Sequence, residues 1–267
     1  MPTLAPSPRQ RTVRHETAIE LLDGEIRRIA ELIADTAPTA PVPNCPGWDL
    51  EALIRHVALI HKWARTMVEK LTPKRIPQRT IDAEPPADWT AVPAWFSHNG
   101  AELVAALRGA DPDAPMYSWA ADKHVRFWIR RMLHETTIHR TDAEGAAGVA
   151  SRIEPAVAVD AIDELLELLP YAEFFRPNVH DLRGDGETIH LHATDIDGTG
   201  LPGEWLITLE PEGFRWSRAH VKGAAAIRGD VQDLALFMYG RRKADDAALT
   251  VIGDTSLLAH WSANSSF

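Results

Sequence analysis

Helical periodicity in the first half of the chain places the strongest constraint on the fold. Between residues 12 and 36, isoleucine and leucine recur at intervals of three or four, which predicts an amphipathic helix of about 24 residues. Prolines then break the pattern, and Asp49 stands where the N-cap of a second helix, extending to about Lys70, is expected. Similar patterns near residues 92–107 and 122–145 predict a third and a fourth helix. Four helices joined by loops favour a helix bundle.

The second half of the chain has a different pattern. After a helix predicted over residues 156–169, the stretch ETIHLHATD alternates polar and apolar residues, as a strand does. The stretch GEWLITLEPEGFRWSRA predicts a hairpin with its turn at Glu212-Gly213, and AAIRGDVQDLALFMYGRR and LTVIGDTSLLAHW each predict a strand followed by a helix. Strands and helices in this order are typical of an α+β domain. We therefore expect an α+β protein with two domains, a four-helix bundle over residues 1–150 and a mixed domain over residues 151–267.

Charge and composition exclude several classes of protein. The 267 residues carry a net charge of −10, whereas nucleic acids and anionic membranes bind basic surfaces. No apolar run near the N-terminus marks a secretory signal, and no stretch approaches the roughly 18 apolar residues of a membrane span. The single cysteine excludes an internal disulfide framework and a cysteine-rich metal site. We expect a cytoplasmic protein that binds neither nucleic acid nor membranes; its oligomeric state is not indicated.

Residues 134–140 read HETTIHR, which resembles the zinc-protease motif HExxH with one residue too many. An α-helix turns about 100° per residue, so His134 and His139, five residues apart, point to nearly opposite sides. Glu135 and His139 are four residues apart and lie one above the other on the same face. The stretch therefore predicts a carboxylate–imidazole pair that needs a further ligand from another helix.

The second predicted helix offers that ligand as His56, which lies on the apolar stripe of the helix. Taken alone, a histidine there is more often a satisfied core residue, and a helix glutamate such as Glu135 is more often solvated. Together with His139, however, they form a set that a cation would stabilise, because an unpaired buried carboxylate is costly. Two histidines and one glutamate leave a coordination position open, as in catalytic zinc sites, and iron and nickel accept the same set.

Residues near this set have a supporting role in the same hypothesis. Asp142 follows His139 by three and could orient its imidazole as a second-shell residue, together with the neighbouring Arg140. The alternative is a surface ion pair of Arg140 and Asp142 that closes the helix. Cys45 precedes the second helix, where a thiol pKa can fall, but the sequence shows no base beside it. We interpret Cys45 as a structural or incidental thiol.

Other histidines in the four predicted helices are not assigned to the site. His61 lies five residues after His56 and faces another direction, and His134 points away from His139. His15 and His98 belong to the first and third helices and remain reserve candidates for a ligand.

The motifs CPGWDLEALIRHVALIHKWA and HETTIHRTDAE, in this order and on these helices, resemble the mycothiol-dependent maleylpyruvate isomerase family, within the DinB-like metal-binding bundles. The stretches AAAIRGDVQDLALFMYGRR and LTVIGDTSLLAHW resemble the C-terminal, sterol-carrier-like α+β domain of that family. The resemblance covers almost the whole chain. Its N-terminal motifs are specific to the superfamily and not to one reaction.

The resemblance implies a zinc triad, which falls on His56, Glu135 and His139. In the family, the open zinc position binds the thiol of mycothiol, a low-molecular-weight thiol of actinobacteria. A coordinating thiol is deprotonated, so the metal provides a thiolate nucleophile at neutral pH. The implied activity is addition of this thiolate to a small electrophilic substrate, by an isomerase that later expels the thiol or by a transferase that keeps the C–S bond.

Either reaction needs a cation near the carboxylate or carbonyl of the substrate. The second half offers Arg215, Arg218 and Arg228, and the sequence does not distinguish among them or exclude a surface role for each. Two other functions remain open. One is metal-assisted hydrolysis by zinc-bound water, and the other is a metal-containing binding protein for a small ligand without turnover.

Overall fold

The computed structural model describes residues 12–265 and confirms the α+β class. The chain forms two compact units: the first spans Arg14–Arg152 and is helical, and the second begins at Ile153 and contains a five-stranded sheet with helices. Among the described residues, no helix combines the length and the apolar character that crossing a membrane requires.

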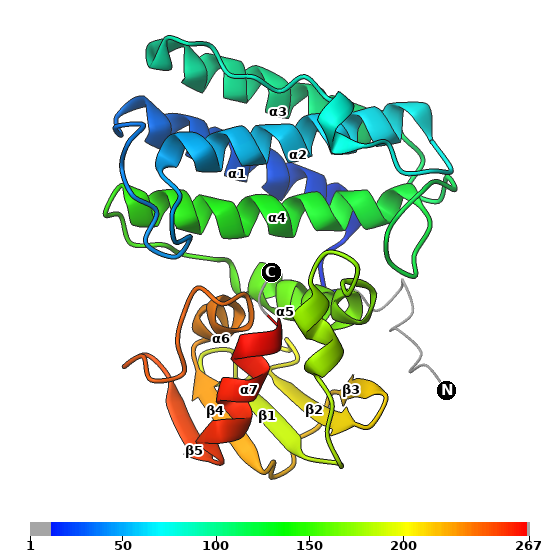
Figure 1. Ribbon diagram of the computed structural model, residues 1–267, viewed down its shortest axis with the longest axis vertical. Helices are drawn as coiled ribbons and strands as arrows, with labels where there is room; N and C mark the ends of the chain where they lie inside the picture. The colour runs from blue at the N-terminus through cyan, green and yellow to red at the C-terminus, as the bar shows by residue number, and fades with distance from the viewer. Residues whose placement is uncertain (1–11, 266–267) are drawn as a thin grey trace. The chain divides into compact units, whose positions relative to one another are not determined.

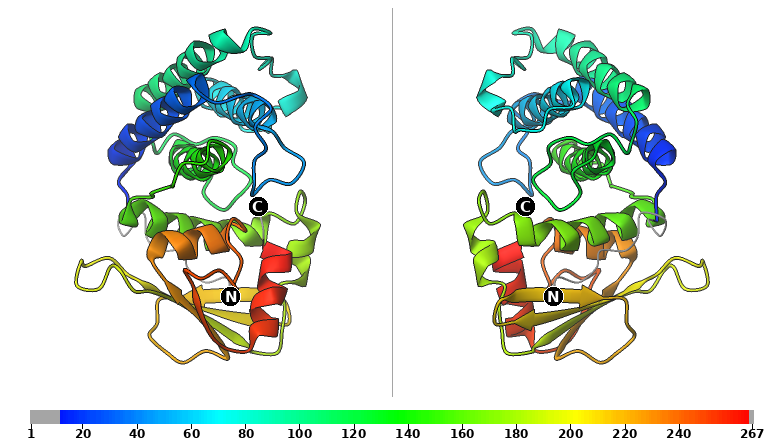
Figure 2. Two further views of the ribbon diagram at one scale, coloured as in Figure 1. Left: turned by 90° about the vertical axis from the view of Figure 1, so that its left-hand side faces the viewer. Right: turned by 90° about the vertical axis from the view of Figure 1, so that its right-hand side faces the viewer.

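Four long helices build the first unit, as the periodicity predicts. They are α1 (His15–Ala34), α2 (Leu50–Lys70), α3 (Val92–Gly109) and α4 (Val125–Ala146). α1 packs against α3 and α4, and α2 packs against the same two helices (Figure 1). In Figure 2, α4 is seen with α1 on one side and α2 on the other. This order makes α2 and α4 neighbours, which is the condition for a site that takes ligands from both.

Local sequence signals explain how these helices begin and pack. The side chain of Asp49 accepts a hydrogen bond of 2.9 Å from the backbone N–H of Ala52, as an N-cap does. Between α2 and α3, the chain forms only the short 3-10 turns Gln78–Thr80 and Trp89–Ala91. The apolar stripe of α1 is buried along its whole length, through Ile19, Leu22, Ile26, Ile29 and Ile33.

The predicted start of α4 near residue 122 is three residues too early. His124 has the extended conformation (φ −133°, ψ 167°) and forms a β-bridge with Pro115. Asp122, which sequence reasoning took as the start, instead accepts hydrogen bonds from the side chains of His124 (2.7 Å) and Arg126 (2.8 Å). Contacts among these side chains hold this segment extended, so the helix begins at Val125.

The strands of the second unit are β1 (Thr188–Ala193), β2 (Glu204–Glu210), β3 (Gly213–Ser217), β4 (Ala225–Gly229) and β5 (Thr250–Gly253). They form a mixed sheet in the order β3-β2-β1-β4-β5 (Figure 1). β1 and β4 are parallel, and the other neighbouring pairs are antiparallel. α5 (Pro155–Leu168) precedes the sheet, α6 (Val231–Met238) joins β4 to β5, and α7 (Thr255–Ser265) follows β5. Short 3-10 turns lie at Leu169–Tyr171 and Pro177–Asp181.

One face of this sheet is the core of the unit. Its buried side chains are Ile189, Leu191, Trp205, Ile207, Leu209, Ala225 and Ile227. Helices cover this face: the indole N–H of Trp205 donates to Asp163 on α5, and the ring of Phe214 contacts Trp261 on α7. Because side chains alternate along a strand, the polar residues between these positions lie on the opposite face.

The hairpin between β2 and β3 is confirmed, but its turn lies one residue earlier than predicted. Glu210 pairs with Gly213, so the connecting residues are Pro211 and Glu212. Gly213 has φ 141°, a backbone conformation that favours glycine, which explains why this glycine marks the turn without being inside it.

Candidate metal centre

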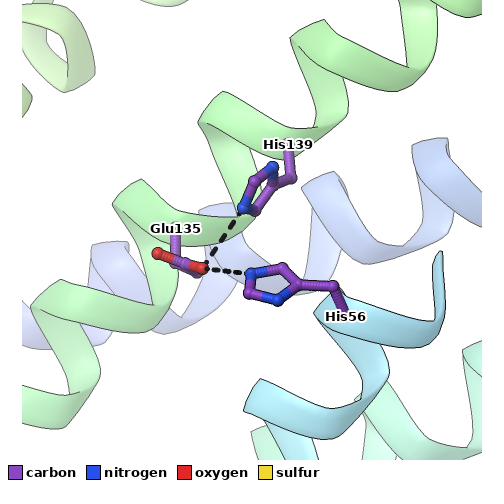
Figure 3. Close-up of side chains that lie close together, drawn as sticks. All are labelled: His56, Glu135 and His139. Carbon is purple, nitrogen blue, oxygen red and sulfur yellow. Dashed lines mark hydrogen bonds and ion pairs between the residues drawn. The ribbon is translucent and has the colours of Figure 1, made fainter. Parts of the chain in front are cut away.

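Two neighbouring helices of the bundle bring three potential metal ligands together. His56 lies on α2, and Glu135 and His139 lie one helical turn apart on α4 (Figure 3). Figure 3 shows both imidazoles directed toward the carboxylate of Glu135. The spacing of four residues thus places Glu135 and His139 on one face of α4, and the packing of α2 beside α4 adds the side chain of His56.

The donor atoms of this triad have the spacing of a metal site. The Nε2 atoms of His56 and of His139 each lie 3.3 Å from Oε1 of Glu135. One donor atom from each of the three residues lies within 4.8 Å of the others. With zinc–ligand bonds of 2.0–2.1 Å, the donors of a tetrahedral site are about 3.3 Å apart. The residues present therefore fit a divalent metal ion.

Partial burial protects the triad without closing it. The side chain of His139 is 10% exposed, that of Glu135 22% and that of His56 32%. The ring of His56 meets the edge of His139 at a centroid distance of 5.0 Å and that of Trp48 at 5.1 Å. The triad is therefore partly open to solvent, most of all at His56.

Electrostatics favour an ionised carboxylate at the centre. Burial opposes ionisation of Glu135, but hydrogen bonds with His139 and His56 and the charge of Arg131 outweigh it and hold the pKa of Glu135 well below its usual range. Burial also disfavours a charged imidazole at His139. Hydrogen bonds with Asp142 and Glu135 overcome that effect and raise the pKa of His139 to about 9. Glu135 is thus ionised and His139 protonated near neutral pH, and a metal ion would take the place of the proton on Nε2 of His139.

Asp142 stands behind His139, as its position in the sequence suggested. Its Oδ2 lies 2.9 Å from Nδ1 of His139, on the other side of the ring from Glu135. Asp142 has no exposed surface, so the alternative of a surface ion pair is wrong. Cys45 donates through its thiol to the same Oδ2 at 3.5 Å. The thiol of Cys45 thus has a carboxylate as a hydrogen-bond partner, which the sequence did not indicate.

Arg140 belongs to a separate buried network. Its guanidinium pairs with Glu25 on α1 and Glu144 on α4 and donates to the backbone carbonyl of Arg152 at 2.8 Å. Arg28 on α1 also reaches Glu144, at 3.0 Å. These contacts join α1 to α4. Arg140 therefore supports the helix that carries Glu135 and His139 through contacts with other residues. This corrects its predicted place beside the site.

Two residues at the site were missed by sequence reasoning. Arg131 is 5% exposed, and its guanidinium lies 3.5 Å from Oε2 of Glu135, which follows it one turn later on α4. Trp48, which stands two residues before the start of α2, contacts the ring of His56. The spacing of four residues between Arg131 and Glu135 was a usable signal, because such pairs meet on a helix face.

The remaining histidines take other positions. His61 is fully buried, and its Nε2 lies 2.8 Å from the hydroxyl of Thr136, while burial lowers its pKa to about 4. His134 is also fully buried, and it does not belong to the set of ligand atoms that lie within 4.8 Å of one another at the triad. The reserve candidates stay apart from the triad as well, since His15 begins α1 and His98 is 74% exposed on α3 beside Glu102.

The three candidate arginines of the second unit have different environments. Arg215 pairs with Glu210 on the neighbouring strand at 2.5 Å. Arg218 contacts both carboxylate oxygens of Asp163 at 2.5 Å and lies over the ring of Trp205. Arg228 is exposed on β4. Arg215 and Arg218 thus have carboxylate partners within the unit, and Arg215 and Arg228 are both exposed to solvent.

Comparisons with known proteins agree with this architecture. Residues 19–144 match the family model of the mycothiol maleylpyruvate isomerase N-terminal domain, and residues 156–260 match that of the MDMPI C-terminal domain. Solved structures of mycothiol-dependent maleylpyruvate isomerase (TM-score 0.55, 15% identity) and of a histidine-to-alanine mutant of it (0.58, 14%) each cover 90% of this chain and 93% of their own. At this identity the likeness establishes the fold. No curated protein is detectably similar in sequence.

Proposed function

Because the chain belongs to the mycothiol maleylpyruvate isomerase family, we propose that it is a zinc-dependent enzyme that uses mycothiol to act on a small electrophilic substrate, as a cis–trans isomerase or as an S-transferase. The observation that carries this proposal is the meeting of His56, Glu135 and His139, with both imidazole nitrogens 3.3 Å from one carboxylate oxygen. The family match supports the thiol and the reaction class, and the triad supports the metal.

His56, Glu135 and His139 would hold the metal, through two Nε2 atoms and a carboxylate oxygen. When bound, zinc supplies a positive charge that lowers the pKa of a coordinating thiol, so that the thiol is a thiolate near neutral pH. A set of three protein ligands leaves a position for that thiol. The only cysteine of the chain, Cys45, contacts Asp142, which supports a cosubstrate as the source of the reacting sulfur.

Residues around the triad would keep it ready for the metal. Asp142 accepts the Nδ1 proton of His139 and so presents Nε2, the nitrogen that faces Glu135, to a metal ion, which would displace the proton there. Arg131 keeps Glu135 ionised and places a positive charge beside the site. Trp48 forms a wall next to His56 and shields one side of the site from water.

The proposed chemistry needs no redox partner. The thiolate forms a C–S bond at one carbon of a cis double bond that is conjugated to a carbonyl, and the π electrons move onto the carbonyl oxygen. Rotation about the former double bond follows, the electrons return to form the trans double bond, and the C–S bond breaks to release the thiolate. An S-transferase would keep the C–S bond, and the adjacent carbon would take a proton. We propose Arg131 as a cation that stabilises the negative oxygen.

The first experiment is metal analysis of the purified protein and of matched histidine variants. His56→Ala removes a ligand, whereas His98→Ala removes an exposed histidine that lies 3.7 Å from Glu102 on α3. We expect the wild type and His98→Ala to bind the same amount of zinc, and His56→Ala to bind about one ion per chain less, because each ligand is needed for tight binding. Equal zinc content in His56→Ala and the wild type would refute the triad.

Activity assays then distinguish the reaction. Maleylpyruvate is the first substrate to offer, with and without mycothiol, and product formation only with the thiol is the expected result. Turnover without thiol would replace this proposal with metal-assisted hydrolysis. Tight binding of mycothiol without turnover of maleylpyruvate or of other conjugated carbonyl compounds would instead indicate a binding protein.

A further inference from the structure

The second unit carries a separate group of three histidines around one glutamate, here called the sheet cluster: His190, His192, Glu204 and His220. His190 and His192 are two residues apart on β1, so both lie on the face of the sheet opposite the helices. Glu204 on β2 pairs directly with His192 across the strands. His220 follows the end of β3 by three residues and reaches back to the same carboxylate.

The geometry of the sheet cluster is that of a ligand set. Nδ1 of His220 lies 2.6 Å from Oε1 of Glu204, Nε2 of His190 lies 3.2 Å from Oε2, and Nδ1 of His192 lies 3.7 Å from Oε1. The three imidazole rings are mutually 6.0–6.1 Å apart between centroids. Within the described part of the chain, only the triad in the bundle and the set His190, Glu204 and His220 bring three ligand atoms within 4.8 Å of one another.

Burial and charge also suit a bound cation. The side chains of His190, His192 and Glu204 are 10%, 16% and 23% exposed, whereas His220 is 80% exposed on its loop. The carboxylate of Glu204 supplies a negative charge, and the imidazole nitrogens around it are donors that divalent transition metals accept.

We propose that His190, Glu204 and His220, with His192 as the fourth ligand, form a second metal site for a divalent transition-metal ion such as zinc. Imidazole and carboxylate ligands suit zinc, copper, nickel and iron. Four protein ligands fill a tetrahedral coordination shell, which is typical of structural zinc sites and unlike the three-ligand triad of the bundle. The site would therefore tie the exposed loop around His220 to the sheet. It lies wholly within the second unit and does not depend on the proposed enzyme activity.

The test uses the full chain without a polyhistidine tag, in a variant with a disabled triad. In His56→Ala/His139→Ala, cobalt(II) is titrated as a spectroscopic probe, and only the sheet cluster can then give a tetrahedral cobalt spectrum. We expect about one cobalt ion per chain. Adding His220→Ala or Glu204→Gln should abolish the signal. Adding His180→Ala should leave it unchanged, because His180 forms an exposed pair with Glu173 at 3.3 Å in the same unit.

Wild-type protein supplies a second measurement if the double variant does not fold. Elemental analysis of zinc-saturated wild type should give about two ions per chain, and about one ion in either His220→Ala or His56→Ala. Absence of the cobalt spectrum, or equal metal content in wild type and His220→Ala, would overturn the proposal. If His220→Ala is less stable than the wild type and zinc stabilises both proteins equally, the sheet cluster is a hydrogen-bonded group only, and this result would also overturn the proposal.

Discussion

Replacement of Asp142 by asparagine tests how much the residue behind His139 contributes to metal binding, because the ligand His139 itself is kept. Asp142 is fully buried, and its Oδ2 accepts from Nδ1 of His139 at 2.9 Å. Asparagine keeps the size and one oxygen acceptor but removes the negative charge. A hydrogen bond to a charged group contributes about 1.5–3 kcal/mol. Carboxylates behind a ligand histidine change metal affinity by about 10–100-fold, which corresponds to about 1.4–2.7 kcal/mol. The two ranges agree, so we expect the metal Kd to rise about 10–100-fold.

The assay is competition for zinc with a chromophoric chelator of known affinity, at one pH and ionic strength. Asp122→Asn is the matched control, because Asp122 makes the same kind of contact with His124, at 2.7 Å, just before the start of α4. His124 is not part of the triad, so Asp122→Asn should bind zinc as the wild type does. Thiol-dependent turnover at limiting zinc should fall in Asp142→Asn in parallel with metal occupancy.

Two results would refute this reasoning. Equal zinc affinity in Asp142→Asn and the wild type would mean that the contact with His139 does not prepare it for the metal. Equal weakening in Asp142→Asn and Asp122→Asn would mean that both substitutions act through the stability of α4. Circular dichroism and thermal unfolding of both variants show whether the helices are retained.

The remaining predictions concern stability and the single thiol. A Cβ at Gly100 would collide with Ile26 on α1, so Gly100→Ala should lower the free energy of unfolding by about 1–3 kcal/mol. The control is Gly109→Ala, which should not lower it, because a Cβ at Gly109 meets open space. Urea denaturation measures the free energy of unfolding of both variants. His61 has a folded pKa of about 4 against 6.5 unfolded, so the unfolded chain binds more protons and stability should fall by about 2 kcal/mol between pH 7 and pH 5. His61→Gln should remove that part of the pH dependence, and an unchanged pH profile would contradict the assignment. Cys45→Ser keeps a hydroxyl donor for the same carboxylate and should retain thiol-dependent turnover; complete loss would place the cysteine in the reaction.

The helices and strands were predictable because their signals are local. The helical spacing from Ile19 to Ile33 gave α1, and Asp49 marked the start of α2 through a cap that the structure contains. The errors lie where side chains act outside regular elements. Asp122 contacts His124 and Arg126 in place of capping α4, and the hairpin turn uses the residues before Gly213.

The candidate metal centre was predictable in part for the same reason. Glu135 and His139 share one helix, so their spacing alone places them together, whereas the meeting with His56 depends on α2 packing beside α4. Four helices can pack in more than one order, and periodicity does not distinguish among them. Arg131 was missed although it lies one turn from Glu135, because arginines on helices are usually solvated and only the structure places this one at the site.

The sheet cluster was not predictable in this way, because its members meet only through strand register. The pairing of His192 with Glu204 depends on the alignment of β1 and β2, and a slip of one residue would turn every side chain of a strand to the other face. Burial of Leu191 and Trp205 on the helix-covered face fixes that alignment. The apolar residues that form the core thus also position the histidines on the opposite face. The sheet should therefore fold without a metal, and a bound ion should act mainly on the exposed loop that carries His220, where its removal can be detected without unfolding the unit.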